Sequence, residues 1–213
     1  SYSGAYALKL TSDSLDNDIY FGYVFSNGQL AEQEISDTPR YSGGFPITTA
    51  PDSLCGFFKF NIAENDTAIG MLSFKKNGVI VGQDLIKITG TSNQFVKLAF
   101  DVDETMFTPD TAMIAFSCSN PFDEPVAGNW LIIDSLWFKG SPDTIPNADF
   151  EEWTEVKYDD PVGWASLNEM LASNNQQSVT KTTDKHSGSY AVRIESMMAI
   201  DIEGMPNTIS TGI

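Results

Sequence analysis

Two apolar segments of this chain combine aromatic rings with amines in a pattern suited to binding sugars. Phe57 and Lys59 alternate in one segment, while Trp130 opens the other and Trp137 lies further along it. Aromatic faces stack on the apolar sides of pyranose rings, and a few donors and acceptors beside them bind the hydroxyl groups. We therefore predict a ligand-binding surface formed by these four residues. The alternative is that the rings fill a second sheet or seal an interface between domains.

Groups suited to catalysis are few. The chain has one His, His186, so a Ser-His-Asp triad would have to use that residue. With only two Cys, it lacks the ligands of a zinc ribbon. Among its 29 Asp and Glu residues, no pair stands out by spacing for glycoside hydrolysis. We therefore expect a protein without catalytic activity, and keep a glycoside hydrolase or other carbohydrate-active enzyme as the alternative.

Composition and charge limit the partners. The 213 residues include 12 Lys and Arg against 29 Asp and Glu, a formal net charge of −17. Such a surface repels phosphates, which argues against nucleic acid as a partner. No apolar run approaches the roughly 18–20 residues of a membrane span, so we expect no transmembrane segment. We expect a secreted or outer-surface protein whose export signal or anchor is not in this chain.

Short segments with a period of two residues dominate the chain, and Gly, Pro, Asn and Asp clusters separate them. This pattern is typical of antiparallel sheets and predicts an all-β chain. The Asn77-Gly78 pair predicts a hairpin turn, because both residue types tolerate positive φ. The expected strands are Ala5–Leu10, Leu54–Ile62, Ala68–Lys75, Val79–Ile88, Gln94–Val102, Ala112–Cys118 and Trp130–Lys139.

The two cysteines lie in apolar, strand-like segments. Cys55 and Cys118 could pair if their strands are neighbours, as an oxidising compartment would allow. Buried free thiols are the alternative, because unpaired Cys is among the most buried residue types.

An internal repeat suggests how the chain is organised. Ser3–Ser12 recurs as Ser187–Ser196, with an offset of 184 residues, unless the match is a coincidence. A unit of about that length means that the chain holds little more than one unit. We expect residues 1–140 to form the main part of one sandwich, 141–146 a linker, and 147–213 the opening strands of the next unit.

Several motifs resemble those of bacterial jelly-roll modules. Asn147–Trp153 is similar to the Asn-x-(Gly/Asp)-Phe-Glu start of galactose-binding-domain-like and carbohydrate-binding modules, and Pro161–Trp164 to their Pro-x-Gly-Trp. His186–Ile194 resembles their His-Ser-Gly-x-Tyr-Ala strand. The first 140 residues resemble the rest of such a unit in gut-bacterial surface proteins, in a domain named for carbohydrate metabolism. The segments concerned are Pro51–Phe60, Pro109–Ser117 and Leu131–Leu136.

The resemblance implies a fold and a function. The fold would be an antiparallel β-sandwich of jelly-roll, galactose-binding-domain-like type. The function would be that of a non-catalytic carbohydrate-binding or adhesion-like module of an exported bacterial surface protein, with a structural spacer as a further alternative. The resemblance also implies a structural Ca²⁺ held by Glu151, by carbonyl groups of residues 185–188 and by Asp134, because Ca²⁺ takes oxygen ligands.

The repeat also predicts how the sandwich is completed. If residues 1–140 lack opening strands, the segment Phe150–Ile194 could supply them, within one chain or by strand exchange between two. The alternative is that residues 1–140 form a complete small sandwich with a separate C-terminal piece.

Overall fold

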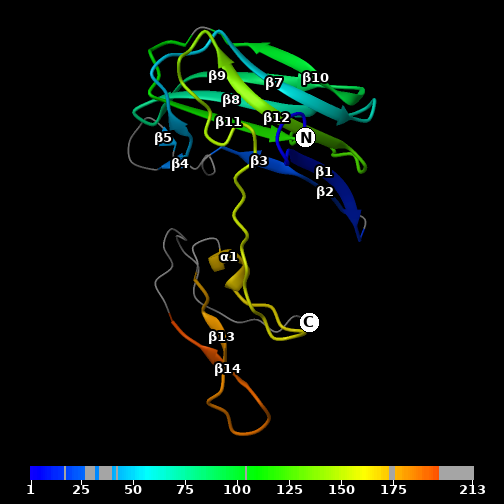
Figure 1. Cartoon of the computed structure of the whole chain (residues 1–213), viewed down its shortest axis with the longest axis vertical. Helices are drawn as coiled ribbons and strands as arrows, with labels where there is room; N and C mark the ends of the chain where they lie inside the picture. The colour runs from blue at the N-terminus through cyan, green and yellow to red at the C-terminus, as the bar shows by residue number, and fades with distance from the viewer. Residues whose placement is uncertain are drawn as a thin grey trace. The chain divides into compact units, whose positions relative to one another are not determined.

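A computed structural model gives the fold of this chain (Figure 1). It describes residues 1–16, 18–26, 32–33, 40–41, 43–103, 105–172 and 176–196. The chain divides into two compact units, residues 1–152 and 153–213, which we call unit 1 and unit 2. The division falls after Glu152, later than the linker expected from the sequence, so the Asn147–Trp153 motif belongs to unit 1 except for Trp153.

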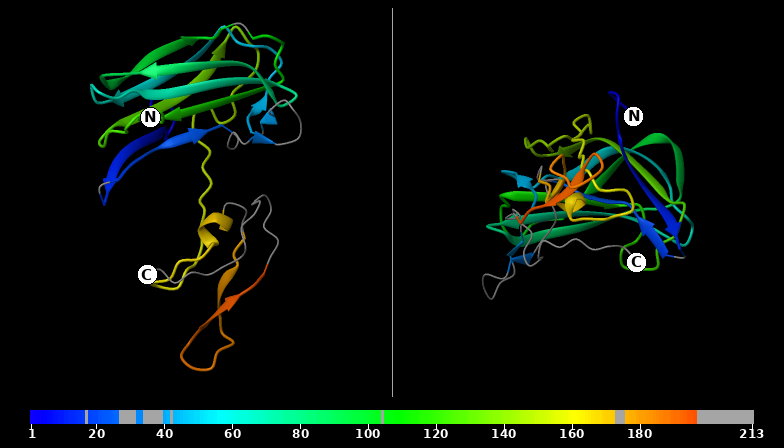
Figure 2. Two further views of the ribbon diagram at one scale, coloured as in Figure 1. Left: turned by 180° about the vertical axis from the view of Figure 1, so that it is seen from behind. Right: turned by 90° about the horizontal axis from the view of Figure 1, so that it is seen from below.

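Unit 1 is an antiparallel β-sandwich, as the strand periodicity predicted, and Figure 2 shows its two layers. The jelly-roll subtype stays a prediction. The first sheet has the order β10 (Thr91–Asp101), β7 (Ser53–Asn61), β12 (Trp130–Lys139), β1 (Leu8–Leu15) and β2 (Asp18–Phe21). The second has the order β3 (Tyr23–Phe25), β11 (Thr111–Ser117), β8 (Ala68–Lys76) and β9 (Val79–Ile88), and β6 (Phe45–Pro46) also pairs with β11. A short separate pair consists of β4 (Glu32–Gln33) and β5 (Arg40–Tyr41).

The core lies between the two sheets. Alternate residues of each strand face inward, since successive side chains of a strand point to opposite faces. Phe58 of β7 is fully buried, and its ring contacts those of Phe116 and Phe100 edge-on, with centroids 5.9 and 5.7 Å apart. Leu131 and Ile133 of β12 are likewise fully buried. The intervening residues of these strands therefore face outward.

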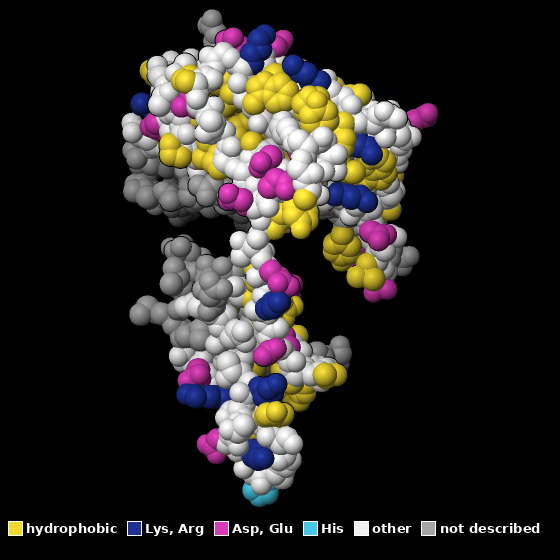
Figure 3. Space-filling view, viewed as in Figure 1, with side chains coloured by type: hydrophobic (Ala, Val, Ile, Leu, Met, Phe, Trp, Pro, Cys, Tyr) yellow, Lys and Arg dark blue, Asp and Glu magenta, His cyan; other side chains and the backbone are white. Residues whose placement is uncertain are grey.

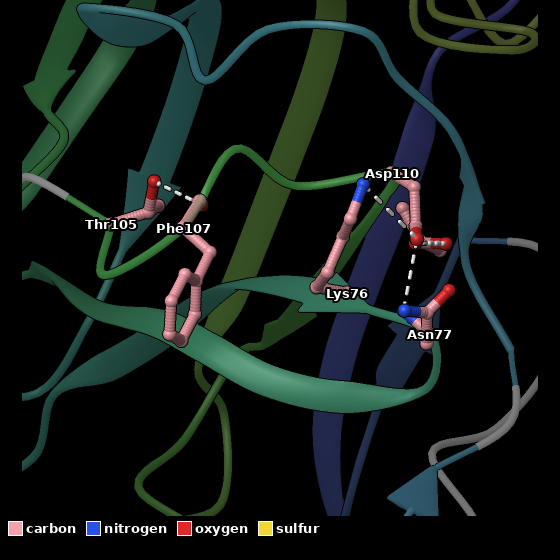
Figure 4. A network of polar contacts seen from close by, with 6 residues as sticks. Lys76, Asn77, Thr105, Phe107 and Asp110 are labelled. Carbon is pink, nitrogen blue, oxygen red and sulfur yellow. Dashed lines mark hydrogen bonds and ion pairs between the residues drawn. The ribbon is translucent and has the colours of Figure 1, made fainter.

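The β8–β9 hairpin turns at Asn77-Gly78 as predicted, with φ of 52° and 81°. Asp110 supports this turn (Figure 4): its carboxylate accepts a hydrogen bond from the Asn77 N–H at 2.8 Å and lies 3.8 Å from the Lys76 amine. The Asn77 hydrogen bond leads the effects that lower the pKa of Asp110. In the loop between β10 and β11, which also contains Asp110, the Thr105 hydroxyl donates to the Phe107 carbonyl at 2.9 Å.

Both cysteines of unit 1 are free thiols. Cys55 on β7 is 2% exposed and Cys118, directly after β11, is fully buried. The sequence left a disulfide and buried free thiols as alternatives, and the structure contains the buried free thiols. Burial raises the pKa of the Cys118 thiol.

Unit 2 contains a short helix, α1 (Asn168–Ala172), and the strand pair β13 (Val179–Thr182) and β14 (Ala191–Ile194). The Asn168 side chain is fully buried: its amide donates to the Asp159 and Val179 carbonyls and accepts from two backbone N–H groups. β13 and β14 pair only with each other among the described strands. The sandwich of this chain is therefore built without them, and the expected completion of its sheets by Phe150–Ile194 within one chain is not found. No helix among the described residues has the length and hydropathy needed to cross a membrane.

Candidate functional site

The predicted ligand residues lie on the outer face of the first sheet. Phe57 is the cross-strand partner of Lys97 on β10 and of Asp134 on β12. Cross-strand partners share a face of a sheet. Because Phe58 and Ile133 face the core, this row faces outward. The register thus brings together side chains from strands that are far apart in the sequence.

Four aromatic side chains form a cluster on this face, which we call the aromatic cluster: Tyr2, Phe57, Phe95 and Trp137. Phe57 and Trp137 are two of the predicted residues, and their ring centroids are 5.8 Å apart. Tyr2 stacks on Phe57 at 3.5 Å and meets Phe95 edge-on at 6.0 Å. Tyr2 itself is 52% exposed, so the cluster presents an open ring to solvent.

Two lysines lie over these rings. The Lys97 amine is 5.0 Å from the centroid of Trp137, and the Lys59 amine is 5.5 Å from that of Phe95. Both distances are within the range of cation–π attraction, about 6 Å. The predicted Lys59 therefore lies against the aromatic cluster. Its amine and that of Lys97 lie beside the rings as hydrogen-bond donors.

Further lysines share the outer face. Lys9 of β1 is the partner of Ile132, in the row of Lys59, and Lys139 is the partner of Ser53. Asp101 of β10 is the acidic residue in the row of Lys139. Asp13 of β1 and Asp134 of β12 are on this face as well, so the four lysines lie among three carboxylates. In the view of Figure 3, hydrophobic side chains of unit 1 lie next to Lys and Arg side chains.

Trp130 is on the same face but outside the aromatic cluster. Its partner on β7 is Asn61, whereas the cluster is centred on Phe57. At about 3.3 Å per residue the two rows are roughly 13 Å apart along the strand. Trp130 could contact a ligand only if the ligand extends along the sheet.

The sequence interpretation missed Tyr2, Phe95 and Lys97. A signal for the latter two was present, because Phe95-Val96-Lys97 repeats the Phe-x-Lys spacing of Phe57-Phe58-Lys59. The pairing of β10 with β7 brings the two Phe-x-Lys segments side by side, and this pairing is known only from the fold. Tyr2 carries no local signal at all.

Two carboxylates hold the N-terminal residues 2–6 against the rest of unit 1, and we call these carboxylates the carboxylate clamp. Asp134 is fully buried and accepts hydrogen bonds from the backbone N–H groups of Tyr2 and Ser3 at 2.5 and 3.3 Å. Glu151 accepts from the N–H groups of Ala5 and Tyr6 at 3.1 and 2.9 Å. The clamp thereby positions the Tyr2 ring over the aromatic cluster.

The clamp consists of the two residues predicted to bind Ca²⁺. The structure brings Asp134 and Glu151 to one segment, but their oxygens accept hydrogen bonds from N–H groups and, at Asp134, from the Ser135 hydroxyl at 2.9 Å. In this arrangement a cation would have to share the carboxylates with these donors. Among the described residues, no group of three or more His, Cys, Asp and Glu could hold a metal ion. Calcium stays a prediction.

A second apolar surface lies on the second sheet. Tyr23 and Phe25 of β3 line a groove with Met71, Leu85 and Phe122, and the Tyr23 and Phe25 rings are 5.7 Å apart. The lining of this groove is almost entirely apolar, with the hydroxyl groups of Tyr23 and Ser117 as its polar side-chain groups. A sugar needs donors and acceptors for its hydroxyl groups, so the outer face of the first sheet fits a sugar better.

Asp66 is a buried carboxylate with a structural task. It is 7% exposed, and all its contacts are donors: the N–H groups of Thr67, Asn120 and Val126, the Ser119 hydroxyl and the Asn129 amide. These donors join the start of β8 to the loop between β11 and β12. With its oxygens occupied by protein donors, this group is not placed to act as a catalytic base.

Comparisons of the chain with models of protein families, with curated proteins and with solved structures found no match. The outer face of the first sheet has rings and lysine amines outward, and the buried carboxylates Asp66 and Asp134 accept hydrogen bonds from protein donors.

Proposed function

We propose that the chain is a non-catalytic carbohydrate-binding or adhesion-like module of an exported bacterial surface protein. The sugar would bind on the outer face of the first sheet. The observation that carries the proposal is the aromatic cluster, which contains Phe57 and Trp137 within 5.8 Å and has two lysine amines over its rings. The resemblance of the sequence to jelly-roll carbohydrate-binding modules supports the same function.

The lysines favour a class of glycan. The Lys59 and Lys97 amines lie directly over rings of the aromatic cluster. Charged donors make stronger hydrogen bonds to anionic acceptors than to neutral ones. We therefore expect glycans with carboxylate or sulfate groups to bind more tightly than neutral glycans of the same length.

Binding and hydrolysis measured on the same glycans test the proposal. The full chain is applied to an array of neutral and acidic glycans, and the release of reducing ends is followed in parallel. Binding without turnover supports the proposal. Turnover would make the protein a carbohydrate-active enzyme, and the absence of both would leave the structural spacer.

Variants locate the site. Trp137→Ala should weaken binding about tenfold or more, equivalent to about 1.4 kcal/mol. Phe122→Ala is the matched control: Phe122 is 78% exposed and lines the groove of the second sheet, so the affinity should not change. The double variant Lys59→Gln/Lys97→Gln should weaken the binding of acidic glycans more than that of neutral ones, and should reduce the salt dependence of binding. Equal losses for Trp137 and Phe122 variants would place the site elsewhere.

A structural Ca²⁺ at the carboxylate clamp is part of the proposal. Millimolar Ca²⁺ should then raise the melting temperature relative to a chelator, because a ligand that binds the native state stabilises it. The double variant Asp134→Ala/Glu151→Ala should lose this increase. A melting temperature that is the same in Ca²⁺ and chelator would rule the ion out.

A further inference from the structure

β14 and the turn before it repeat the segment that the carboxylate clamp holds in unit 1. Ser187–Ser196 aligns with Ser3–Ser12 at the offset of 184 residues. The glycines of the two copies have the same left-handed conformation, with φ of 63° at Gly4 and 70° at Gly188. Residue types alone define the repeat, so the shared backbone conformation is an independent likeness of the two copies.

The two copies differ in burial. Leu8 and Leu10 of β1 are 8% and 6% exposed, because they pack into the core of unit 1. Their counterparts in β14, Val192 and Ile194, are 50% and 63% exposed. β14 therefore has the apolar face of a core strand, but this face is largely exposed in unit 2.

The glycine environments show the same difference. A Cβ atom built on Gly4 would overlap the Glu151 carboxylate, which would have to move out of the clamp, and the φ of 63° also favours glycine there. A Cβ atom built on Gly188 would have no heavy atom within 4 Å. The second copy keeps the glycine and its φ angle without a carboxylate beside it.

From these contrasts we infer that Ser187–Ile194 is a docking strand for a second copy of this chain. It takes the place of Ser3–Leu10 in that copy, beside β12 and in the carboxylate clamp. A second copy is the partner because its β12, Asp134 and Glu151 already bind a segment of this sequence pattern.

The exchange lets each segment take the strand pairing of the other. The displaced Ser3–Leu10 can pair with β13 in the way that β14 does, since the two segments have the same alternation of apolar and polar residues. Exchange of equivalent elements between protomers is a low-cost route to a dimer. Protein concentration then decides how much of the chain is exchanged.

A disulfide between chains tests the docking. Lys9 is the cross-strand partner of Ile132, and the alignment puts Arg193 in the position of Lys9. Partners in an antiparallel pair have Cα atoms about 4.5–5.5 Å apart, within the span of about 4.4–6.8 Å that a disulfide bridges. The full-chain variant Ile132→Cys/Arg193→Cys should therefore form a covalent dimer under mild oxidation. The dimer should increase with protein concentration and disappear on reduction.

Two control variants calibrate the cross-link. Lys9→Cys/Ile132→Cys should close a disulfide within one chain. Lys59→Cys/Arg193→Cys should give no dimer, because β7 is one strand further and about 10 Å away in this sheet. The native Cys55 and Cys118 are 2% and 0% exposed and so are protected in the folded protein.

The outcomes separate the alternatives. A disulfide within one chain for Ile132→Cys/Arg193→Cys would overturn the second copy as the partner, and no disulfide, with the Lys9 control formed, would overturn docking altogether. Adding Val192→Asn/Ile194→Asn should lower the dimer yield at least fivefold. The matched change Val156→Asn/Val162→Asn, at exposed apolar positions of unit 2 outside β14, should leave the yield unchanged. Equal yields for both pairs would contradict the role of the β14 apolar face.

Discussion

Asp66→Asn should destabilise unit 1 far more than the same change at Asp134, although both carboxylates are buried. Oδ1 of Asp66 accepts from the N–H groups of Thr67 and Asn120 at 2.6 and 3.0 Å. Oδ2 accepts from the Asn129 amide and the Val126 N–H at 2.7 and 3.3 Å. An asparagine amide group would replace one of these oxygens and face donors in either orientation.

The size of the effect follows from the donors that lose an acceptor. With the NH₂ group in place of Oδ1, the Thr67 and Asn120 N–H groups lose their acceptor; in place of Oδ2, the Asn129 amide does, while the Val126 N–H keeps the Ser119 hydroxyl at 3.4 Å. Each buried donor left unpaired costs about 1–3 kcal/mol. The expected loss is therefore about 1–6 kcal/mol, out of the roughly 5–15 kcal/mol that stabilises a domain. For a unit of this size the melting temperature should fall by at least about 2 °C.

Asp134→Asn is the matched control. Its amide oxygen can keep the hydrogen bonds from Tyr2 and Ser3, while its NH₂ group donates to the Ser135 hydroxyl that now donates to Oδ1. All buried polar groups remain paired, so the loss should stay below about 1 kcal/mol. Calorimetry or urea unfolding of both variants gives the comparison. Equal destabilisation of the two variants would refute the reasoning from unpaired donors.

Three further results are expected. Burial raises the pKa of the Asp66 carboxyl but its hydrogen bonds lower it more, so its pKa is below the usual 3.8. The ionised carboxylate therefore stabilises the fold above pH 3.8, and this stabilisation is lost as the pH falls further. In urea titrations, the difference in unfolding free energy between the native chain and Asp66→Asn should narrow as the pH falls from 7 toward 3. A constant difference would contradict this. Because Cys118 is buried and its pKa is raised, a thiol reagent at pH 8 should label it only after unfolding, and rapid native labelling would show that the site opens. Gly4→Ala should loosen the N-terminal segment, since its φ is 63° and a Cβ atom would overlap Glu151; hydrogen exchange that is unchanged there would argue against the clamp.

Much of the sandwich could be predicted because the strand signal is local. The alternation in Leu54–Ile62 separates the inward Phe58 from the outward Phe57 and Lys59 before any partner strand is known. The Asn77-Gly78 turn is likewise set by the φ angles that two adjacent residues tolerate. Half of the aromatic cluster, Phe57 and Trp137, follows from the same alternation.

The remaining site residues come from long-range pairing. Phe95 and Lys97 reach the cluster because β10 pairs with β7, and no local pattern specifies that neighbour. Tyr2 is placed by hydrogen bonds to Asp134, across 132 positions of the chain. Such contacts depend on the free energy of the whole packed unit, which one segment does not reveal.

The duplicated strand separates the two levels. By itself the sequence determined that Ala5–Leu10 and Ser189–Ile194 carry one pattern, with apolar residues alternating and a glycine before them. Only the tertiary structure decided that Leu8 and Leu10 enter a core while Val192 and Ile194 are left at 50% and 63% exposure. Both segments satisfy the same local rules, so the choice between them rests on which one finds β12 and the carboxylate clamp. Burial of apolar surface against a partner is a property of the assembled sheets.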